Sequence, residues 1–413
     1  MPSSNLIFWT LRNRNLKEIV GRVSDVVFGW MIRPLSFITP RSKKKWLIGN
    51  KTGWADNSKY LALALNGTNP ENLRIIWIAK TKEQRDKVRS KGVEAYHKWS
   101  IKGLYHTLTA GALFYSSSSS DINYWASGKA FRMNMWHGVG LKKLGMKQSD
   151  VYNPSSITTR ILTPFFYDKP DYFIGPSDMM AKHFADCYGL EDFRMLKIGY
   201  PRNDFMLQDK DSIREHIRKY ESEKMADLVR KMEDFNKVYI YMPTFRDDQH
   251  DFIKASGLDF AKLNNLLKET NNLLLLKLHP ATRVDSIDFK ALENIVVVDK
   301  TLDVYPLLPF TDVLITDYSS IYYDYILMKD KDVILFPFDY DEYVSGSRDF
   351  AYDYLTYAPG VKAWNFNELY SIIKEDNDLT IPDRDAIIDT FWGSNYNNVV
   401  EKIKQATFDK IGV

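Results

Sequence analysis

A β-prone run, one histidine, several glycines and a basic segment follow one another in Phe131-Arg132-Met133-Asn134-Met135-Trp136-His137-Gly138-Val139-Gly140-Leu141-Lys142-Lys143-Leu144-Gly145. Glycines leave backbone N–H groups unshielded and allow a ligand to approach the chain closely. Lys142 and Lys143 add positive charge, so we expect an anion to bind near His137. The alternative is an ordinary strand-to-helix turn whose histidine only packs, since one short motif is no more than a hypothesis.

Short β-prone runs alternate with helical stretches on both sides of this segment. We expect strands at residues 46–49, 74–79, 112–115, 132–136, 172–174, 238–242, 273–278, 295–298, 313–316 and 333–336. Residues 273–278 are almost continuously apolar, which is typical of strands buried on both faces. The alternation predicts an α/β protein with parallel sheets covered by helices.

The chain has 413 residues, more than one hydrophobic core usually supports. We therefore predict two Rossmann-like domains that face an interdomain cleft. The predicted domains are 46–204 and 205–380, and one charged helix at 211–235 precedes the strands of the second. C-terminal helices at 381–413 are expected to pack back on the first domain.

The N-terminal segment, residues 1–45, carries nine basic residues against two acidic ones, hence +7 in a chain whose net charge is +3. Aromatic and aliphatic residues such as Trp9, Phe28 and Trp30 lie between these charges. This mixture suits a basic amphipathic helix in the headgroup region of an anionic membrane. The alternative is a surface helix whose basic side chains are simply solvated.

Amino-acid composition limits the class of protein to which this chain can belong. Hydrophobic residues make up 45% of the chain and charged residues 26%, which indicates a folded protein. The single cysteine, Cys187, cannot form an internal disulfide or a cysteine-based metal cluster, which fits a reducing cytoplasm. We expect neither a secretory signal nor a membrane-spanning segment. The sequence therefore predicts a peripheral protein at the cytoplasmic face of the membrane, with no nucleic-acid partner.

Polar side chains follow the ends of several predicted strands, where ligands bind in open α/β sheets. These positions hold His137, Thr244, His279 and the run Asp317-Tyr318-Ser319-Ser320, while Arg202 lies near the predicted domain junction. Because polar and basic residues collect at one edge of both sheets, the sequence predicts a site for a phosphate-bearing ligand.

Ser319 and Ser320 open a predicted helix, where free N–H groups and the helix dipole attract an anion. Asp324 would lie on the same helix face, able to accept a hydrogen bond from a hydroxyl. Plain N-capping by the serines would explain the same pattern.

Arg202 could hold a phosphate through two parallel hydrogen bonds, or form a surface ion pair with Asp204. Lys277 and His279 would point the same way in an extended strand. Two histidines at a cleft permit a division of work, in which one takes a proton from an attacking hydroxyl and the other steadies a phosphate. Carboxylate pairs occur without a convincing site, so we predict neither a metal nor a cofactor.

Seven short motifs, in this order, resemble the CDP-glycerol glycerophosphotransferase family, whose members build wall teichoic acid and related capsule polymers. The motifs are Trp136-His137-Gly138, Leu141-Lys142-Lys143-Leu144-Gly145, Gly199-Tyr200-Pro201-Arg202-Asn203-Asp204, Pro243-Thr244-Phe245-Arg246-Asp247, Lys277-Leu278-His279-Pro280, Thr316-Asp317-Tyr318-Ser319-Ser320 and Ala358-Pro359-Gly360. The resemblance extends over roughly residues 46–360, and the set of motifs is specific although each motif alone is weak.

The resemblance implies transfer of glycerol phosphate from CDP-glycerol to a hydroxyl of a lipid-linked acceptor, with release of CMP. It implies a GT-B-like architecture, in which the second of two Rossmann-like domains binds most of the nucleotide. At matching positions, it implies that His137 is the base and that His279 contacts the diphosphate. The other positions that it implies for substrate binding are Trp136, Gly138, Val139, Gly140, Leu141, Arg202, Thr244, Phe245, Lys277, Leu278, Ser319, Ser320 and Asp324.

Two positions depart from the family pattern, which commonly has Thr-Pro in place of Val139-Gly140 and Trp in place of Phe245. Either difference fits another polyol, such as ribitol, or another acceptor. A nucleotide-sugar glycosyltransferase or epimerase on the same fold is an alternative, as is a catalytically silent nucleotide-binding module at the membrane. Because no long extra N-terminal domain is expected, a primase is favoured over a polymerase.

Overall fold

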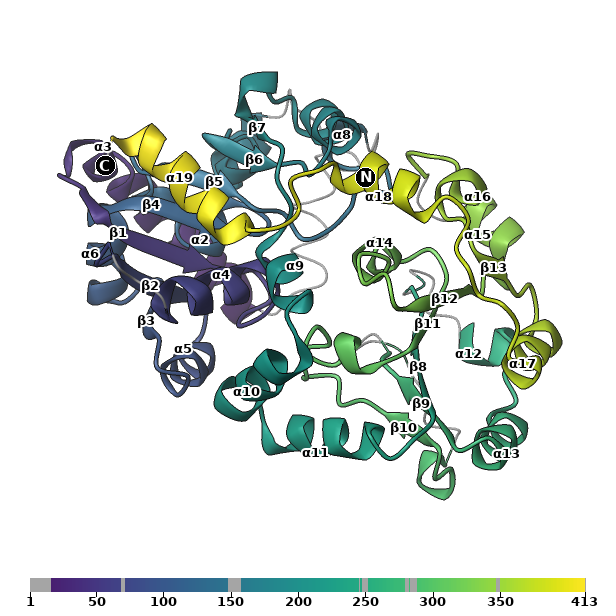
Figure 1. Ribbon diagram of the computed structural model, residues 1–413. Helices are drawn as coiled ribbons and strands as arrows, with labels where there is room; N and C mark the ends of the chain where they lie inside the picture. Colours follow the sequence, from purple (N-terminus) through teal and green to yellow (C-terminus); the bar gives the residue numbers. More distant parts are fainter. Residues whose placement is uncertain are drawn as a thin grey trace. The chain divides into compact units, whose positions relative to one another are not determined.

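The computed structural model describes residues 16–67, 71–147, 157–244, 246, 252–278, 282, 288–346 and 350–412. The chain divides into two compact units, each built around its own parallel sheet (Figure 1). The first unit comprises Met1–His137, Leu144–Asp204 and Trp392–Val413, and the second comprises Gly138–Lys143 and Phe205–Phe391. The prediction of two α/β units with parallel sheets is thereby confirmed.

The sheet of the first unit has seven strands in the order β3-β2-β1-β4-β5-β6-β7, all parallel. Their bounds are β1 Ser42–Gly49, β2 Arg74–Ala79, β3 Glu94–His97, β4 Ala110–Tyr115, β5 Phe131–Asn134, β6 Tyr172–Ile174 and β7 Met195–Leu196. Every residue of the central strand β4 is buried, and so is the second half of its neighbour β1. Burial on both faces explains why these strands are apolar runs rather than alternating ones.

The sheet of the second unit has six parallel strands in the order β10-β9-β8-β11-β12-β13. Their bounds are β8 Lys237–Met242, β9 Asn272–Leu276, β10 Ile295–Val297, β11 Val313–Thr316, β12 Asp332–Leu335 and β13 Val361–Lys362. The core of this unit joins side chains of the central strands, such as Tyr241, Leu274 and Ile315, to helix residues such as Leu266.

Helices connect the strands of both units. Their bounds are α2 Leu16–Ile32, α3 Leu35–Ile38, α4 Asp56–Gly67, α5 Lys82–Arg89, α6 Ile101–Thr109, α7 Ile157–Leu162, α8 Asp178–Tyr188, α9 Pro201–Met206, α10 Lys210–Tyr220, α11 Glu223–Met232, α12 Phe252–Ala255, α13 Phe260–Glu269, α14 Ile321–Tyr325, α15 Tyr340–Gly346, α16 Tyr354–Tyr357, α17 Phe366–Glu375, α18 Arg384–Trp392 and α19 Val399–Ile411. Ser177 caps α8, because its side chain accepts a hydrogen bond from the Met180 N–H.

Several predicted boundaries were wrong. The single helix expected at 211–235 is two helices, because Glu221 and Ser222 are extended and Ser222 begins α11. Strand β5 ends at Asn134, before the predicted end, since Trp136 has a left-handed φ of 56°. The short edge strands β3, β7 and β13 were not predicted, because two to four residues carry too little pattern to recognise.

Each sheet reverses its strand order at one place, between β1 and β4 in the first unit and between β8 and β11 in the second. Such a reversal opens a crevice at the carboxyl ends of the two diverging strands, which is where open α/β sheets bind ligands. The residues that follow these strands include Asn50, Ser116, Thr244 and Asp317. Two of these four positions, Thr244 and Asp317, belong to runs that the sequence had singled out.

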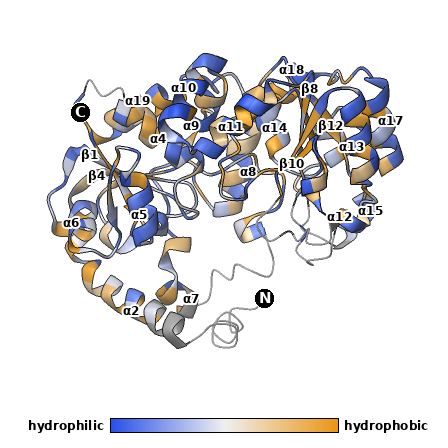
Figure 2. Ribbon diagram, turned by 90° about the horizontal axis from the view of Figure 1, so that it is seen from below, coloured by the Kyte–Doolittle hydropathy of each residue, from blue (hydrophilic) through white to orange (hydrophobic). Residues whose placement is uncertain are grey.

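The N-terminal helices expose apolar side chains. Residues coloured as hydrophobic recur along the α2 ribbon in Figure 2. Phe28 is 58% exposed, Met31 66% and Ile38 76%. Several basic residues of this segment are engaged within the fold. Arg41 donates to the carbonyls of Thr107, Ala110, Ser36 and Ala126, and burial lowers its pKa to about 10.

Strand β1 begins at Ser42, so Lys43, Lys44 and Lys45 lie in the first sheet rather than in a preceding helix. Among the described residues, no helix is both long enough and apolar enough to cross a membrane.

The C-terminal helix α19 packs against α4 and β5 of the first unit. Trp46 of β1 contacts Phe408 with ring centroids 5.3 Å apart, and Lys404 pairs with Glu71 at 2.7 Å. Ile403 is fully buried in this contact region. Helix α19 therefore packs onto the core of the first unit, to which strand β1 also contributes.

We expect Ile403→Ala to lower the free energy of unfolding by about 2–5 kcal/mol, because it leaves a cavity under α19. The matched control is Gln405→Ala on the exposed face of the same helix, for which a change within about 0.5 kcal/mol is expected. Urea denaturation followed by circular dichroism measures both. Equal midpoints for the two variants would show that α19 contributes little to the first unit.

Candidate functional site

His137 follows β5 in a backbone conformation that several groups hold in place. The N–H of Trp136 donates to Asn134 Oδ1 at 2.9 Å, and the Trp136 carbonyl accepts from Asn57 Nδ2 at 2.9 Å. A left-handed φ at a bulky residue such as Trp136 costs about 1–3 kcal/mol and persists only where surrounding contacts enforce it. Gly138, with a φ of 153°, adopts a conformation that side chains disfavour.

The indole of Trp136 anchors this turn in an aromatic cluster. Its ring lies 5.6 Å from those of Phe173 and Phe184 and 5.3 Å from that of Tyr188. The His137 ring lies 4.1 Å from the same indole, but His137 itself is an exposed residue. Trp136 is thus buried in the cluster, and the residue that follows it, His137, is exposed.

The His137 ring has a defined tautomer in this arrangement. Its Nδ1 lies 3.0 Å from the carbonyl oxygen of Ser116. Because a carbonyl oxygen only accepts, the proton of the neutral ring must be on Nδ1. Nε2 then carries the lone pair, which is the state that a general base requires.

Arg202 lies beside this turn rather than at the protein surface, with an exposed fraction of 2%. Its Nη1 donates to Asp56 Oδ1 at 2.7 Å and to the carbonyl oxygen of His137 at 2.9 Å. The expected alternative partner, Asp204, instead accepts from the Val400 N–H. The role of Arg202 in substrate binding stays a prediction, but the guanidinium is in direct contact with the His137 backbone.

The residues that follow His137 belong to the second unit. Val139 and Leu141 are buried, and the Leu141 carbonyl accepts from the Ala351 N–H at 2.8 Å. Lys142 forms an antiparallel bridge with Phe350, and its amino group hydrogen-bonds the Tyr343 hydroxyl. The chain therefore passes from one unit to the other directly after the histidine.

In the second unit, a buried ion network lies at the carboxyl ends of β8 and β11. Arg246 donates to Asp317 Oδ2 at 2.9 Å and to both carboxylate oxygens of Asp339. Asp317 Oδ1 also accepts from the Thr244 N–H at 2.8 Å, and the Tyr318 hydroxyl donates to Asp339. Burial alone would lower the pKa of Arg246, but the two carboxylates raise it above its ordinary value.

This network places three predicted residues at one edge of the sheet. Ser319 and Ser320 are half-buried, and the Ser320 side chain makes no capping bond to α14. Capping of α14 therefore does not explain why a serine stands at position 320. Ser319 Oγ, in contrast, accepts a hydrogen bond from the Ile321 N–H at 3.4 Å. The hydroxyl of Thr244 is buried and has no hydrogen-bond partner within the described part of the chain.

Other predicted site residues make their contacts within the second unit. The amino group of Lys277 donates to the carbonyls of Asp299, Lys300 and Leu302, and burial lowers its pKa. Leu278 is buried in the core, and the buried Asp324 accepts from the Tyr305 hydroxyl at 3.2 Å. Their contact with substrate stays a prediction.

Two predicted residues, Phe245 and His279, lie outside the described residues, so their predicted roles stay predictions. Sequence reasoning had assigned no role to Asn57 and Ser116, which contact the His137 turn from distant parts of the chain, or to Asp56, which pairs with Arg202. No local motif marks them, because only the fold brings them to the end of β5. Among the described residues, no group of three or more His, Cys, Asp or Glu could hold a metal ion.

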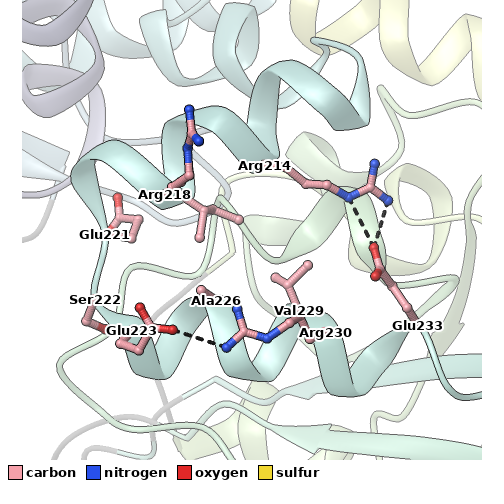
Figure 3. Close-up of a pocket in the computed structure, with 10 residues that line it drawn as sticks. Arg214, Arg218, Glu221, Ser222, Glu223, Ala226, Val229, Arg230 and Glu233 are labelled. Atoms are coloured by element: carbon pink, nitrogen blue, oxygen red, sulfur yellow. Dashed lines mark hydrogen bonds and ion pairs between the residues drawn. The ribbon is translucent and has the colours of Figure 1, made fainter.

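A separate pocket of about 320 Å³ lies between α10 and α11 (Figure 3). Ion pairs bridge its charged rim, with Arg214 on Glu233 at 2.7 Å and Arg230 on Glu223 at 3.1 Å. None of the predicted site residues lines it. We therefore place the candidate site at the strand ends and not in this pocket.

We expect Asp317→Asn to lower the free energy of unfolding by about 3–5 kcal/mol, because it leaves Arg246 buried beside only one carboxylate. The control is Glu215→Gln, which removes the exposed ion pair with Arg218 and should cost at most about 1 kcal/mol. Thermal and urea unfolding would measure both variants. A loss no larger for Asp317→Asn than for the control would contradict the importance of the network.

Comparison with known proteins gives one family and several relatives. A family model described as CDP-Glycerol:Poly(glycerophosphate) glycerophosphotransferase matches residues 35–408. The teichoic acid poly(glycerol phosphate) polymerase of Staphylococcus epidermidis is 28% identical over 339 residues, which are 79% of this chain and 44% of the relative. The chain thus spans less than half the length of that polymerase.

The teichoic acid ribitol-phosphate primase of Bacillus spizizenii is 27% identical over 391 residues, covering 91% of this chain and 94% of the relative. Among solved structures, a variant of the wall teichoic acid polymerase TagF soaked with CDPG is similar, with a TM-score of 0.72 at 25% identity. That match covers 96% of this chain and 97% of the other.

Proposed function

The chain belongs to the CDP-glycerol:poly(glycerophosphate) glycerophosphotransferase family, and from this premise we propose that it transfers glycerol phosphate from CDP-glycerol to an acceptor hydroxyl. The family match confirms the resemblance that the motifs suggested. The observation that carries the proposal is the exposed His137 ring, whose Nδ1 hydrogen-bonds the Ser116 carbonyl.

In the proposed reaction, His137 Nε2 takes the proton of the acceptor hydroxyl, which attacks the β-phosphorus of CDP-glycerol. A bond forms between this oxygen and the phosphorus, and the bond to the bridging oxygen breaks, so that CMP leaves. Phosphoryl transfer depends mainly on positioning and on offsetting the phosphate charge. We assign the second task to His279, Thr244, Ser319 and Ser320.

The buried hydroxyl of Thr244 without a described partner supports a donor contact at that position, because a buried polar group left unpaired costs free energy. In the expected GT-B arrangement, residues 46–204 hold the acceptor, residues 205–380 hold the CDP-polyol, and both face a common cleft. Phe245, Lys277, Leu278 and Asp324 complete the proposed donor side.

CDP-ribitol is a second candidate donor, because a relative that matches 91% of this chain over 94% of its own length is named a ribitol-phosphate primase. Incubation with CDP-glycerol and with CDP-ribitol, followed by mass analysis of the acceptor, separates the two. The turn at Val139 and Gly140, which lacks the hydroxyl common in the family, is the place where the polyol preference would be expected to arise.

We expect His137→Ala to lower the rate of CMP release by about 100- to 10,000-fold while CDP-glycerol still binds within about two-fold of the wild-type affinity, because removing the base leaves the donor contacts in place. CMP is measured by chromatography and binding by calorimetry. The control is His216→Ala on α10, where the histidine contacts Glu221 away from the candidate site. Near-normal turnover in His137→Ala would remove His137 from the role of base.

We further propose that the acceptor is lipid-linked and that the protein binds the cytoplasmic face of the membrane through α2, α3 and α7. The exposed apolar side chains support this proposal more than the basic ones, since Arg33, Arg41 and Lys45 are engaged within the fold. In α7, Ile157 is 74% exposed, and the carbonyl of Ile161 accepts from the Trp30 indole of α2. Together these helices form one apolar face for an interfacial location.

Replacing Val27 and Met31 together by aspartate should weaken binding to phosphatidylglycerol vesicles by at least about ten-fold, because each apolar side chain contributes roughly 1.5–3 kcal/mol on burial. Vesicle co-sedimentation measures the binding. The control is Phe193→Asp, which changes another exposed aromatic residue outside these helices. Unchanged binding of the double variant would show that this face does not contact the membrane.

A further inference from the structure

Two side chains hold the two peptide groups that flank the Cα of His137. Asn57 Nδ2 donates to the carbonyl of Trp136, which precedes the histidine, at 2.9 Å. Arg202 Nη1 donates to the carbonyl of His137 itself at 2.9 Å. Both peptide planes next to the histidine are therefore tied to residues that are distant in the sequence.

Asp56 lies next to Asn57 in the chain and pairs with Arg202. Its Oδ1 accepts from the Arg202 guanidinium at 2.7 Å, which offsets the charge of a side chain that is only 3% exposed. The backbone N–H of Arg202, at the start of α9, lies 3.5 Å from Asn57 Oδ1. The start of α4 and the start of α9 thus meet at the His137 turn.

The turn needs such external contacts because its own conformation is unfavourable. Trp136 has a φ of 56° and Asp56 a φ of 60°, both in the left-handed region. Residues with side chains keep this conformation only where neighbouring contacts over-determine it. Without the bonds to the two carbonyls, the peptide groups could rotate towards extended geometry and carry the His137 ring away from the Ser116 carbonyl.

We propose that Asp56 and Arg202 are positioning residues for His137. Arg202 fixes the backbone of the histidine through the carbonyl, and Asp56 keeps the guanidinium in place. This inference rests on the proposed function, and it differs from the phosphate contact that the family resemblance implied for Arg202. Displacement of a catalytic group by about 1 Å can cost about 100-fold in rate.

The test is a set of variants assayed for CMP release and for CDP-glycerol binding. Asp56→Asn and Arg202→Lys should each lower kcat by about 30- to 100-fold and leave the dissociation constant of CDP-glycerol within about two-fold, because positioning acts on the reacting geometry. Lysine keeps the charge but lacks the planar fork that reaches both Asp56 and the His137 carbonyl. The double variant should lose no more than the worse single variant.

The same substitutions in the His137→Ala background separate positioning from general destabilisation, because destabilisation would lower the rate in either background. Neither should lower the residual rate further, since the group that they position is absent. The matched control is Asp168→Asn, which weakens another largely buried arginine pair of the first unit, with Arg132, and should leave kcat within about two-fold.

Three results would overturn the inference. They are a ten-fold weaker CDP-glycerol affinity with unchanged kcat, additive losses in the double variant, and a further loss in the His137→Ala background. The first result would restore Arg202 to a phosphate contact. Failure of the proposed function is a different observation, because wild-type protein would then release no CMP from CDP-glycerol.

Discussion

The hydrogen bond between His137 Nδ1 and the Ser116 carbonyl is the contact on which the candidate site depends. It assigns the ring proton to one nitrogen and leaves the other as an acceptor. The bond forms only because β4 and β5 are neighbours in the sheet, so that the residues after both strands meet. The parallel order of the first sheet is therefore a direct requirement of the chemistry that we propose.

The second unit uses its strand ends differently. Arg246, Asp317 and Asp339 form a buried ion network that organises the backbone at Thr244 and Tyr318. The hydroxyls of Ser319 and Ser320 follow this rigid segment directly. A site that must hold two phosphates gains from such a scaffold, since ligand groups are bound most strongly where donors are fixed before the ligand arrives.

Most of the architecture could be predicted from the sequence, because buried parallel strands are long apolar runs that alternate with helices. His137, Thr244 and Ser319 were predicted as site residues from their places after such strands, and their contact with substrate stays a prediction. Asp56 and Asn57 could not be found in this way, since Asn57 contacts Trp136 across 79 residues of chain and Asp56 contacts Arg202 across 146. The end of β5 was misplaced for a related reason, because a tryptophan in the left-handed region has no signature in the sequence.

The tautomer of His137 is the most direct test of this account. Nitrogen NMR of protein labelled with ¹⁵N-histidine, assigned by comparison with His137→Ala, distinguishes a protonated Nδ1 from a protonated Nε2 in the neutral ring. We predict that Nδ1 carries the proton and that Nε2 shows the shift of an unprotonated nitrogen. A ring protonated on Nε2 would contradict the hydrogen bond to Ser116 and, with it, the assignment of His137 as the base.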